Sequence, residues 1–366
     1  MKRLRLLVSA VALLLNPSAI HAETQFEQVS ERVYIHSELK TKEIDLYAAP
    51  IYSIGEWDKE ELLQRIAMYF DKELIFVPEK EHHSEGKTYI EAEHYELKDT
   101  GYWLNVSHDK SFTEIPKWNI YMEEESENPY TNLVNNVILF PHIGYDATHL
   151  ANQELPFMSF VAVERKVQDF LQQVFAESHM TFQLDMRSIT LNEMADYIDY
   201  QNVNKLKGDD YIGDFKEAYF GQITAQIGDY PVYWHTRGSE TFFDGGTQGE
   251  FVLTEDGFKV FNWWNVTPVG TSIMTYPKEE GIIKVDKVEQ VLSIVTKELE
   301  RNESTWLLEH TFYIEAIDLV YVPMKISGFS TEKLYYPIWQ VVVREDGKDG
   351  TDTNRLFIEP EGQIWR

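Results

Sequence analysis

The sequence predicts an α+β fold made of tandem units, each a helix packed on an antiparallel sheet. Segments with helical periodicity are separated by segments in which apolar residues alternate with a period of two. The strand-like segments follow each helix as a group, which favours antiparallel units over a doubly wound sheet. Aromatic residues make up 14% of the chain, enough for sizeable cores.

Three long segments have the apolar spacing of amphipathic helices. The first and third open with a capping box, an Asp followed three residues later by a Glu, at Asp58 and Asp286. The second spans residues 159–178, and a shorter helix is expected from Thr190. The residues expected on the three buried stripes are Leu62, Leu63, Ile66, Phe70 and Leu74; Phe160, Val163, Val167, Phe170, Leu171 and Val174; and Val288, Val291, Leu292, Val295 and Leu299.

Between and after these helices the pattern is that of strands. Asp256-Gly257 separates two of them and is typical of a hairpin turn. The expected strands are 102–106, 118–122, 221–227, 251–254, 258–262, 311–322, 337–345, 355–359 and 363–365. With a signal peptide at 1–22, this order predicts three α+β units at 23–150, 151–278 and 279–366.

Residues 1–22 have the pattern of a cleavable secretory signal. Three basic residues precede an apolar run at residues 6–15, which is followed by Pro17 and the small residue Ala22. The run is shorter than the roughly 20 residues that span a bilayer, so a retained anchor is the weaker interpretation. We expect cleavage after or near Ala22 and an extracytoplasmic protein, secreted or associated with the cell envelope, with no transmembrane segment in the mature chain.

The composition narrows the classes of partner and chemistry. The chain has no cysteine, which excludes disulfides, thiol catalysis, thiolate metal sites and anchoring through a lipobox cysteine, and favours a bacterial origin. Acidic residues outnumber basic ones 61 to 33, giving a net charge of −28, or −31 once the signal with its three basic residues is removed. Such a surface repels nucleic acid, so nucleic acid is not an expected partner.

From residue 281 onward, the chain has a fixed order of predicted strands, a helix and a hairpin. A strand at 282–285 leads into the third helix, and a later strand ends at Pro323. The segment Tyr336-Pro337-Ile338-Trp339 then precedes a hairpin whose last strand carries a small turn and an Ile. This quarter of the chain resembles the PepSY-like and YycI-like modules of exported proteins in Gram-positive bacteria. The whole chain also resembles uncharacterised exported proteins of these bacteria, most of which have a lipobox cysteine.

The resemblance implies a binding or regulatory role outside the membrane. PepSY-like and YycI-like modules are linked to peptidase inhibition or to the control of histidine kinases. The regulatory relatives keep an N-terminal transmembrane helix, and this sequence departs from them there.

No catalytic, cofactor or metal motif stands out. The chain has no Gly-x-Ser-x-Gly, no Gly-rich phosphate loop and no His-Glu-x-x-His. The pair His82-His83 and the pair His142 and His149 have no spacing that enforces a tetrahedral zinc site. The acidic loop at 346–354 does not fit the 12-residue calcium pattern and is interpreted as a hairpin loop. We therefore expect no cofactor and no metal.

Aromatic residues are the remaining candidates for contact with a ligand or partner. They are Trp234 with His235, Trp263 with Trp264, and Trp339. Adjacent residues in a strand point to opposite faces, so a single core needs only one of each pair. The other is a candidate stacking platform for a sugar or an anchor for a protein, and packing between sheet-bearing units is the alternative. The strand with Trp339 is apolar on both faces, so one face is expected to contact the middle unit or a partner.

Two functions of different classes follow from these observations. The first is a non-catalytic extracytoplasmic protein that binds or regulates a protein, a peptide or an envelope component. The second is a secreted hydrolase whose acids or histidines come together only in the folded chain, since 61 acidic residues leave many pairings open.

Overall fold

The structure is a computed structural model of the 366-residue chain. The expected signal at 1–22 lies outside the residues that it describes. These residues are 26–55, 58–77, 90–109, 117–124, 130, 150–176, 179–193, 195, 216–233, 249–266, 268–278, 283–301, 310–324, 334–347 and 350–365.

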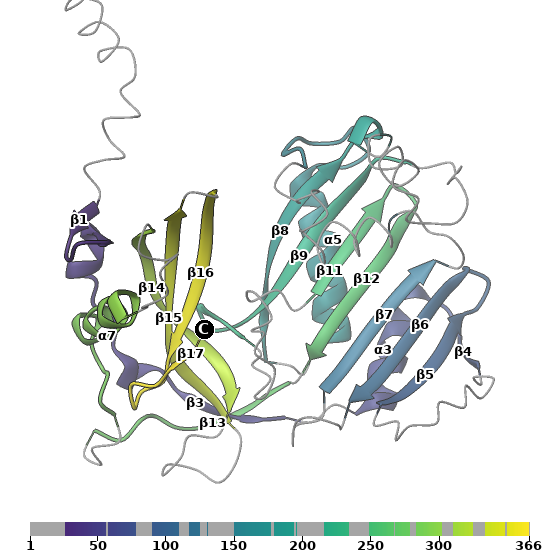
Figure 1. The fold of residues 1–366 in the computed structure, drawn as a ribbon. Helices are drawn as coiled ribbons and strands as arrows, with labels where there is room; N and C mark the ends of the chain where they lie inside the picture. The colour runs from purple at the N-terminus through teal and green to yellow at the C-terminus, as the bar shows by residue number, and fades with distance from the viewer. Residues whose placement is uncertain are drawn as a thin grey trace, which may run out of the picture. The chain divides into compact units, whose positions relative to one another are not determined.

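The described residues form an α+β fold in which strands predominate (Figure 1). The chain divides into two compact units. Unit 1 combines the residues up to Ile51 with those from Ser272 onward, and unit 2 is Tyr52–Thr271. The sequence predicts a different division, into three α+β units that follow one another along the chain.

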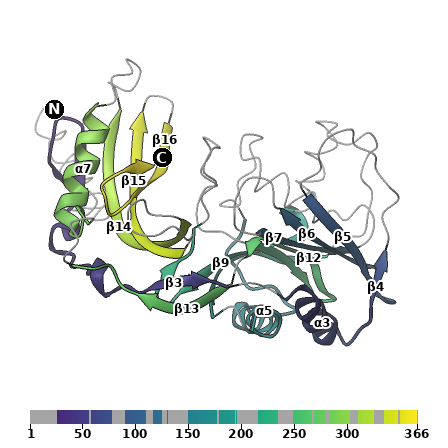
Figure 2. The ribbon, with the colours of Figure 1, turned by 90° about the horizontal axis from the view of Figure 1, so that it is seen from below.

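Unit 2 holds a nine-stranded antiparallel sheet. Its order is β10-β9-β11-β12-β7-β6-β5-β4, and β8 also pairs with β9. The strands are β4 (Leu74–Val77), β5 (Ile90–Leu97), β6 (Tyr102–Asp109), β7 (Lys117–Glu124), β8 (Thr181–Ile189), β9 (Ala218–Ile227), β10 (Tyr230–Pro231), β11 (Gly249–Thr254) and β12 (Gly257–Val266). Helices α3 (Lys59–Phe70) and α5 (Phe160–Val174) lie side by side on one face of this sheet (Figure 2).

The second sheet has eight strands. Its order is β1-β2-β14-β15-β16-β17, with β3 paired to β13 and β15. These strands are β1 (Phe26–Gln28), β2 (Val33–His36), β3 (Ile51–Ile54), β13 (Val269–Met274), β14 (Thr311–Met324), β15 (Leu334–Gly347), β16 (Gly350–Ile358) and β17 (Ile364–Trp365). Strands β2 and β14 run parallel, and α7 (Val288–Arg301) lies beside β14 and β15 (Figure 1).

Two long-range strand pairings explain why the units differ from those expected. Strand β7 of the expected first unit pairs with β12 of the expected middle unit, so both belong to one sheet. Strand β2, near the start of the chain, pairs with β14 near its end. A sequence pattern predicts that a strand forms but not which distant strand it joins.

Each of the three long helices starts at a side chain that accepts a hydrogen bond from a nearby backbone amide. The Asp58 carboxylate accepts a hydrogen bond from the Glu61 amide at 3.1 Å, and the Ser159 hydroxyl accepts one from the Ala162 amide at 3.3 Å. The first helix therefore begins as predicted. At the start of α7 the capping group is the Gln290 side chain, whose Oε1 accepts from the Asp286 amide at 2.7 Å.

The buried stripes match the prediction with few exceptions. All five predicted residues of α7 are buried, and so are the last five of the six predicted for α5. The first helix ends earlier than predicted because Asp71 adopts a left-handed backbone with φ 51°. Leu74 consequently begins β4. Thr190 and Glu193 form the predicted helix start, where the Glu193 carboxylate accepts from the Thr190 amide at 2.6 Å.

The core of unit 2 is aromatic. Phe170 of α5 lies 4.7 Å from Phe261 of β12, measured between ring centroids, and Phe175 stacks on Trp263 at 4.9 Å. Gly221 of β9 faces Phe251 of β11, whose ring occupies the space where a Cβ at position 221 would lie. A glycine is needed there because the large ring of Phe251 fills the place of its side chain.

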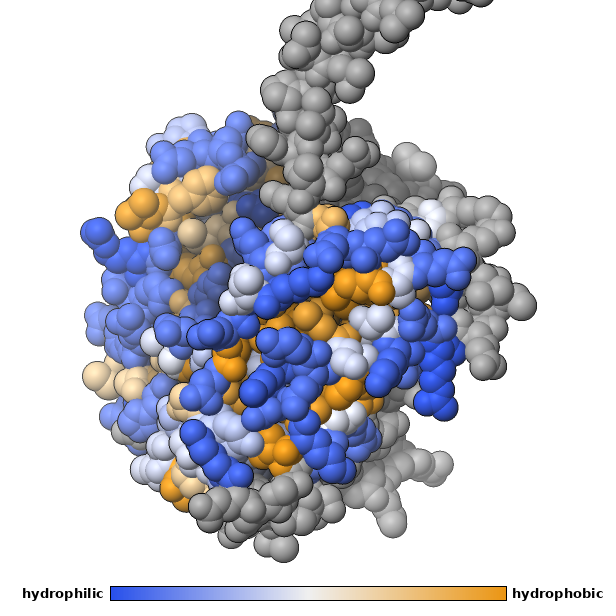
Figure 3. Space-filling model, turned by 90° about the vertical axis from the view of Figure 1, so that its left-hand side faces the viewer, coloured by the Kyte–Doolittle hydropathy of each residue, from blue (hydrophilic) through white to orange (hydrophobic). Residues whose placement is uncertain are grey.

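Hydrophilic residues cover most of the surface seen in Figure 3, which looks onto the side of α7, and the apolar residues form bands between them. Within the described residues, no helix is long and apolar enough to cross a membrane.

Candidate functional site

The aromatic residues expected to contact a ligand fall into two groups. Trp234, His235 and the side chain of Trp264 lie outside the described part of the chain. Trp263 and Trp339 are both fully buried, with 0% of each exposed. These two are therefore core residues, because neither presents a surface to a ligand.

The packing of Trp339 differs from the expectation that its face contacts another unit or a partner. Its indole N–H donates to the Val285 carbonyl at 2.9 Å. Val285 lies three residues before α7, so the indole of Trp339 is anchored to the segment that leads into the helix of its own unit. The residues 283–285 form no strand in the structure, and instead the Lys284 and Val285 amides donate to the Pro360 carbonyl at 2.8 Å and 3.0 Å.

The positions considered for metals gain no support. His82, His83, His142 and His149 lie outside the described residues. In the acidic loop, Arg344 binds Asp346 at 2.5 Å, and Asn354 donates to Glu345 at 3.0 Å. No group of three or more His, Asp or Glu side chains arranged to hold a metal occurs among the described residues.

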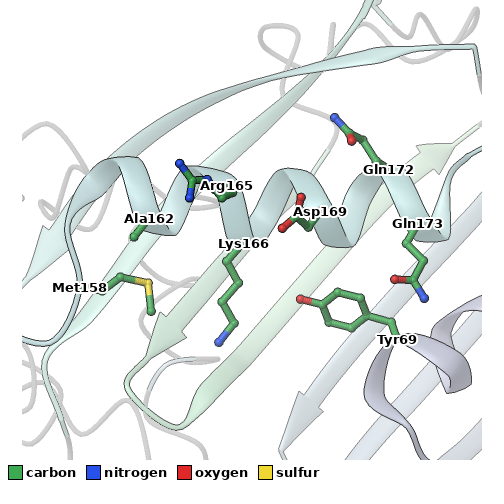
Figure 4. Close-up of a pocket in the computed structure, with 8 residues that line it drawn as sticks. All are labelled: Tyr69, Met158, Ala162, Arg165, Lys166, Asp169, Gln172 and Gln173. Atoms are coloured by element: carbon green, nitrogen blue, oxygen red, sulfur yellow. The ribbon is translucent and has the colours of Figure 1, made fainter.

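An open hollow of about 810 Å³ lies along the exposed side of α5, where α3 runs beside it (Figure 4). We call it the α5 hollow. Its lining combines charged, amide and apolar groups. The lining residues are Tyr69, Met158, Ala162, Arg165, Lys166, Asp169, Gln172 and Gln173.

The helical period places these side chains. The stripe of α5 that includes Val163, Val167 and Phe170 is buried against the sheet. Residues offset from that stripe, such as Lys166 and Gln173, point away from the core and line the hollow. The sequence pattern predicted the buried stripe, but the hollow exists only because a second helix lies alongside.

Tyr69 is the aromatic wall of the α5 hollow. Its ring packs edge-on against Phe170 at 4.8 Å, which holds the ring in place. Partial burial raises the pKa of the Tyr69 hydroxyl, and the nearby Asp169 carboxylate adds to the effect. The hydroxyl therefore stays protonated at neutral pH and is available as a hydrogen-bond donor.

The opposite face of the nine-stranded sheet, which we call the far face, carries a row of polar residues. Asp185 of β8, Gln222 of β9, Glu250 of β11 and Asn262 of β12 are register partners in successive pairs. The side chain of Asp185 is 64% exposed and pairs with Arg187 at 3.4 Å, whereas Glu250 is 0% exposed. The row therefore runs from solvent at β8 to full burial at β11.

Glu250 is the acid of this row whose pKa is clearly shifted. Burial raises the pKa of Glu250 to about 7, against a smaller opposing effect of the hydrogen bond from Asn262. The Asn262 amide donates to Glu250 Oε1 at 3.0 Å, and Oε2 has no hydrogen-bond partner among the residues that the structure describes. Glu250 belongs to no catalytic motif in the sequence. The available signal was a lone acid directly before the apolar run Phe251-Val252-Leu253.

Comparison with known proteins adds information about the fold. No family model and no curated protein matches the chain. A crystal structure of an uncharacterized protein from Eubacterium rectale ATCC 33656 is similar, with a TM-score of 0.51 and 11% sequence identity, covering 93% of each chain. At this identity the likeness concerns the fold alone.

Proposed function

We propose that the protein is an exported, non-catalytic binding or regulatory protein of the cell envelope. Its partner is a protein, a peptide or another envelope component. The pattern of residues 1–22 supports export, and the resemblance of residues 281–366 to PepSY-like modules supports a regulatory role. The observation that carries the binding function is the α5 hollow, because concave sites with a few polar groups are where ligands usually bind.

We also propose that the chain is built from three tandem helix-on-sheet units, two of which share a sheet. Helix α3 is followed by β4-β5-β6-β7, and α7 is followed by β14-β15-β16-β17. Helix α5 is followed by β8, β9, β11 and β12, together with a short helix before β9, the two-residue β10 before β11, and β13. Within each set, strands that follow one another in this order pair antiparallel. The recurrence of one long helix followed by four strands that pair in succession supports common building blocks of the kind that the C-terminal resemblance implies.

Export is tested by the mature N-terminus. The gene is expressed in a Gram-positive host, and the protein is recovered from the culture medium and the cell wall. We expect intact mass and N-terminal sequencing to give a chain beginning at Glu23 or within a few residues of it. Recovery of the chain only from the cytoplasm, with its first 22 residues intact, would refute export.

Binding is tested by photo-crosslinking from the α5 hollow. A photoreactive amino acid replaces Gln172 in one variant and the exposed Glu289 of α7 in a control variant. Each mature protein is incubated with secreted and wall fractions and illuminated. We expect a discrete adduct from position 172 alone. Equal labelling from both positions, or none from either, would contradict a binding site in the hollow.

One observation favours a second function, a secreted glycan hydrolase. Glu250 has the raised pKa of a general acid, and Asp185 lies on the same sheet face two strands away. Neighbouring strands are about 4.8 Å apart, so these residues are separated by about 10 Å, near the roughly 6.5–9.5 Å between the carboxyl groups of inverting glycosidases. Glu250 is fully buried, however, and would have to be uncovered before it could touch a substrate.

The two functions are separated by an assay on wall glycan. Release of reducing sugar by the mature protein, abolished in Glu250→Gln and retained in the surface variant Glu164→Gln, would establish the hydrolase. We expect no release above that of a heat-denatured sample.

A further inference from the structure

We propose that the α5 hollow binds a peptide segment through a side-chain or terminal carboxylate. This inference rests on the proposed binding function and names the class of ligand. Three features support it: the cations Arg165 and Lys166, the hydrogen-bond donors on one side of α5, and the acidic and apolar groups that line the hollow beside them.

Arg165 and Lys166 differ from the cations on the neighbouring helix. On α3, Lys59 pairs with Glu93 at 2.6 Å and Arg65 pairs with Glu61 at 2.5 Å. Within the described part of the chain, Arg165 and Lys166 have no ion-pair or hydrogen-bond partner. In a chain with 61 acids and 33 bases, two adjacent unpaired cations in a hollow are complementary to an acidic ligand.

Two hydrogen-bond donors of the hollow lie on the same side of α5. In Figure 4 the Lys166 ammonium and the Tyr69 hydroxyl lie on the same side of α5, the hydroxyl pointing towards the Asp169 carboxylate, with Met158 towards one end and Gln173 towards the other. A carboxylate has two oxygens that can accept from two such donors at once, and charge-assisted hydrogen bonds of this kind are the strong ones. The hollow is therefore suited to a single carboxylate held by Lys166 and Tyr69.

The other lining groups favour a peptide over other anions. Asp169 is an acceptor, so it suits a ligand that also carries N–H donors, as a peptide backbone does. Met158 and Ala162 offer apolar contact for a neighbouring side chain. A polyphosphate has dense negative charge and no N–H groups, so Asp169 would repel it.

The experiment measures fluorescence anisotropy with the full mature chain. The probe is a labelled hexapeptide of alternating leucine and glutamate, and the comparison peptides carry glutamine or lysine in place of glutamate. The protein variants are Lys166→Gln, Arg165→Gln and Tyr69→Phe. The matched control is Lys297→Gln, which removes an exposed cation from α7 in unit 1 with the same change in net charge.

We expect the glutamate peptide to bind and the glutamine and lysine peptides to bind at least tenfold more weakly. Lys166→Gln should raise the Kd for the glutamate peptide at least tenfold, with smaller increases for Arg165→Gln and Tyr69→Phe and none for Lys297→Gln. Raising the salt concentration should weaken binding, because the contact depends on exposed charges. Unchanged circular dichroism of the variants would show that they remain folded.

Several outcomes would overturn the inference. Equal binding of the glutamine peptide, or equal loss in Lys297→Gln, would exclude carboxylate recognition by the hollow. Tighter binding of inorganic polyphosphate, abolished by Lys166→Gln, would assign the site to a different anion. If no peptide binds while the crosslink from position 172 persists, the ligand class is wrong and the binding function stands. If the crosslink is also absent, both fail.

Discussion

Glu250 and Asn262 face each other across β11 and β12, and the Asn262 amide donates to Glu250 Oε1 at 3.0 Å. The second carboxyl oxygen is buried without a partner. A buried carboxylate with a single neutral donor is expensive to ionise, which is why the pKa of Glu250 rises to about 7.

This relationship predicts a stability that depends on pH. Between its ordinary pKa of 4.5 and about 7, the Glu250 carboxyl binds a proton more tightly in the folded state than in the unfolded one. The free energy of unfolding therefore falls as pH rises through this window, by about 3 kcal/mol in total. Glu250→Gln removes the ionisation, so it should be more stable than the natural protein at pH 8 and similar to it near pH 4.5.

Urea unfolding of both proteins at pH 5 and pH 8 measures the effect. The control is Glu164→Gln, which neutralises an exposed carboxyl on α5. The pH dependence of the natural protein should persist in Glu164→Gln and be much reduced in Glu250→Gln. The same dependence in all three proteins would mean that Glu250 is ionised without penalty.

Gly221→Ala should destabilise unit 2. A Cβ at position 221 would lie 2.3 Å from the Phe251 ring, far inside van der Waals contact. Overpacking of this kind costs about 1–3 kcal/mol. The added cost of Gly221→Ala, measured by thermal unfolding, should be smaller when Phe251→Leu makes room for the methyl group. An equal cost in both backgrounds would rule out the clash as its cause.

Trp339→Asp should be as damaging as Leu292→Asp. Both side chains are buried in unit 1, so each substitution places an unpaired carboxylate in a core. Trp339→Phe should cost less, about 1–3 kcal/mol, because it removes the hydrogen bond to Val285 and leaves that carbonyl unpaired. Unfolding in urea, followed by circular dichroism, ranks the three. A stable Trp339→Asp would place this residue at a partner surface after all.

Folding should require no metal. The two sheets and their helices bury large aromatic cores, and a chain of this length does not need a metal to stabilise it. Thermal unfolding with and without a chelator should give the same midpoint. A drop of several degrees that calcium or zinc reverses would contradict this and direct attention to the histidine pairs and the acidic loop.

The local features were predictable because their causes are local. The stripe on α7 follows from spacing within one helix, and the caps at Asp58 and Ser159 need only the next three residues. The end of the first helix was predicted too late. Leu74 has the spacing of the buried stripe, but the left-handed backbone of Asp71 ends the helix before it.

The candidate sites were less predictable. The sequence drew attention to Trp263 and Trp339, which the fold buries, and gave no reason to connect Tyr69 with Lys166, almost a hundred residues later. Glu250 was one acid among 61, and its raised pKa arises from burial in the sheet.

The sequence by itself determined where the three long helices form, which face of each is buried, where several of the strands lie and, through the absence of cysteine, that disulfides and thiol chemistry are excluded. Only the tertiary structure decided that β7 joins β12, that β2 joins β14, and that α3 lies beside α5. The physical reason is the separation along the chain over which each effect acts. Helix periodicity and capping act over a few residues, whereas strand partners and the burial of a single carboxyl depend on contacts between segments far apart in the chain.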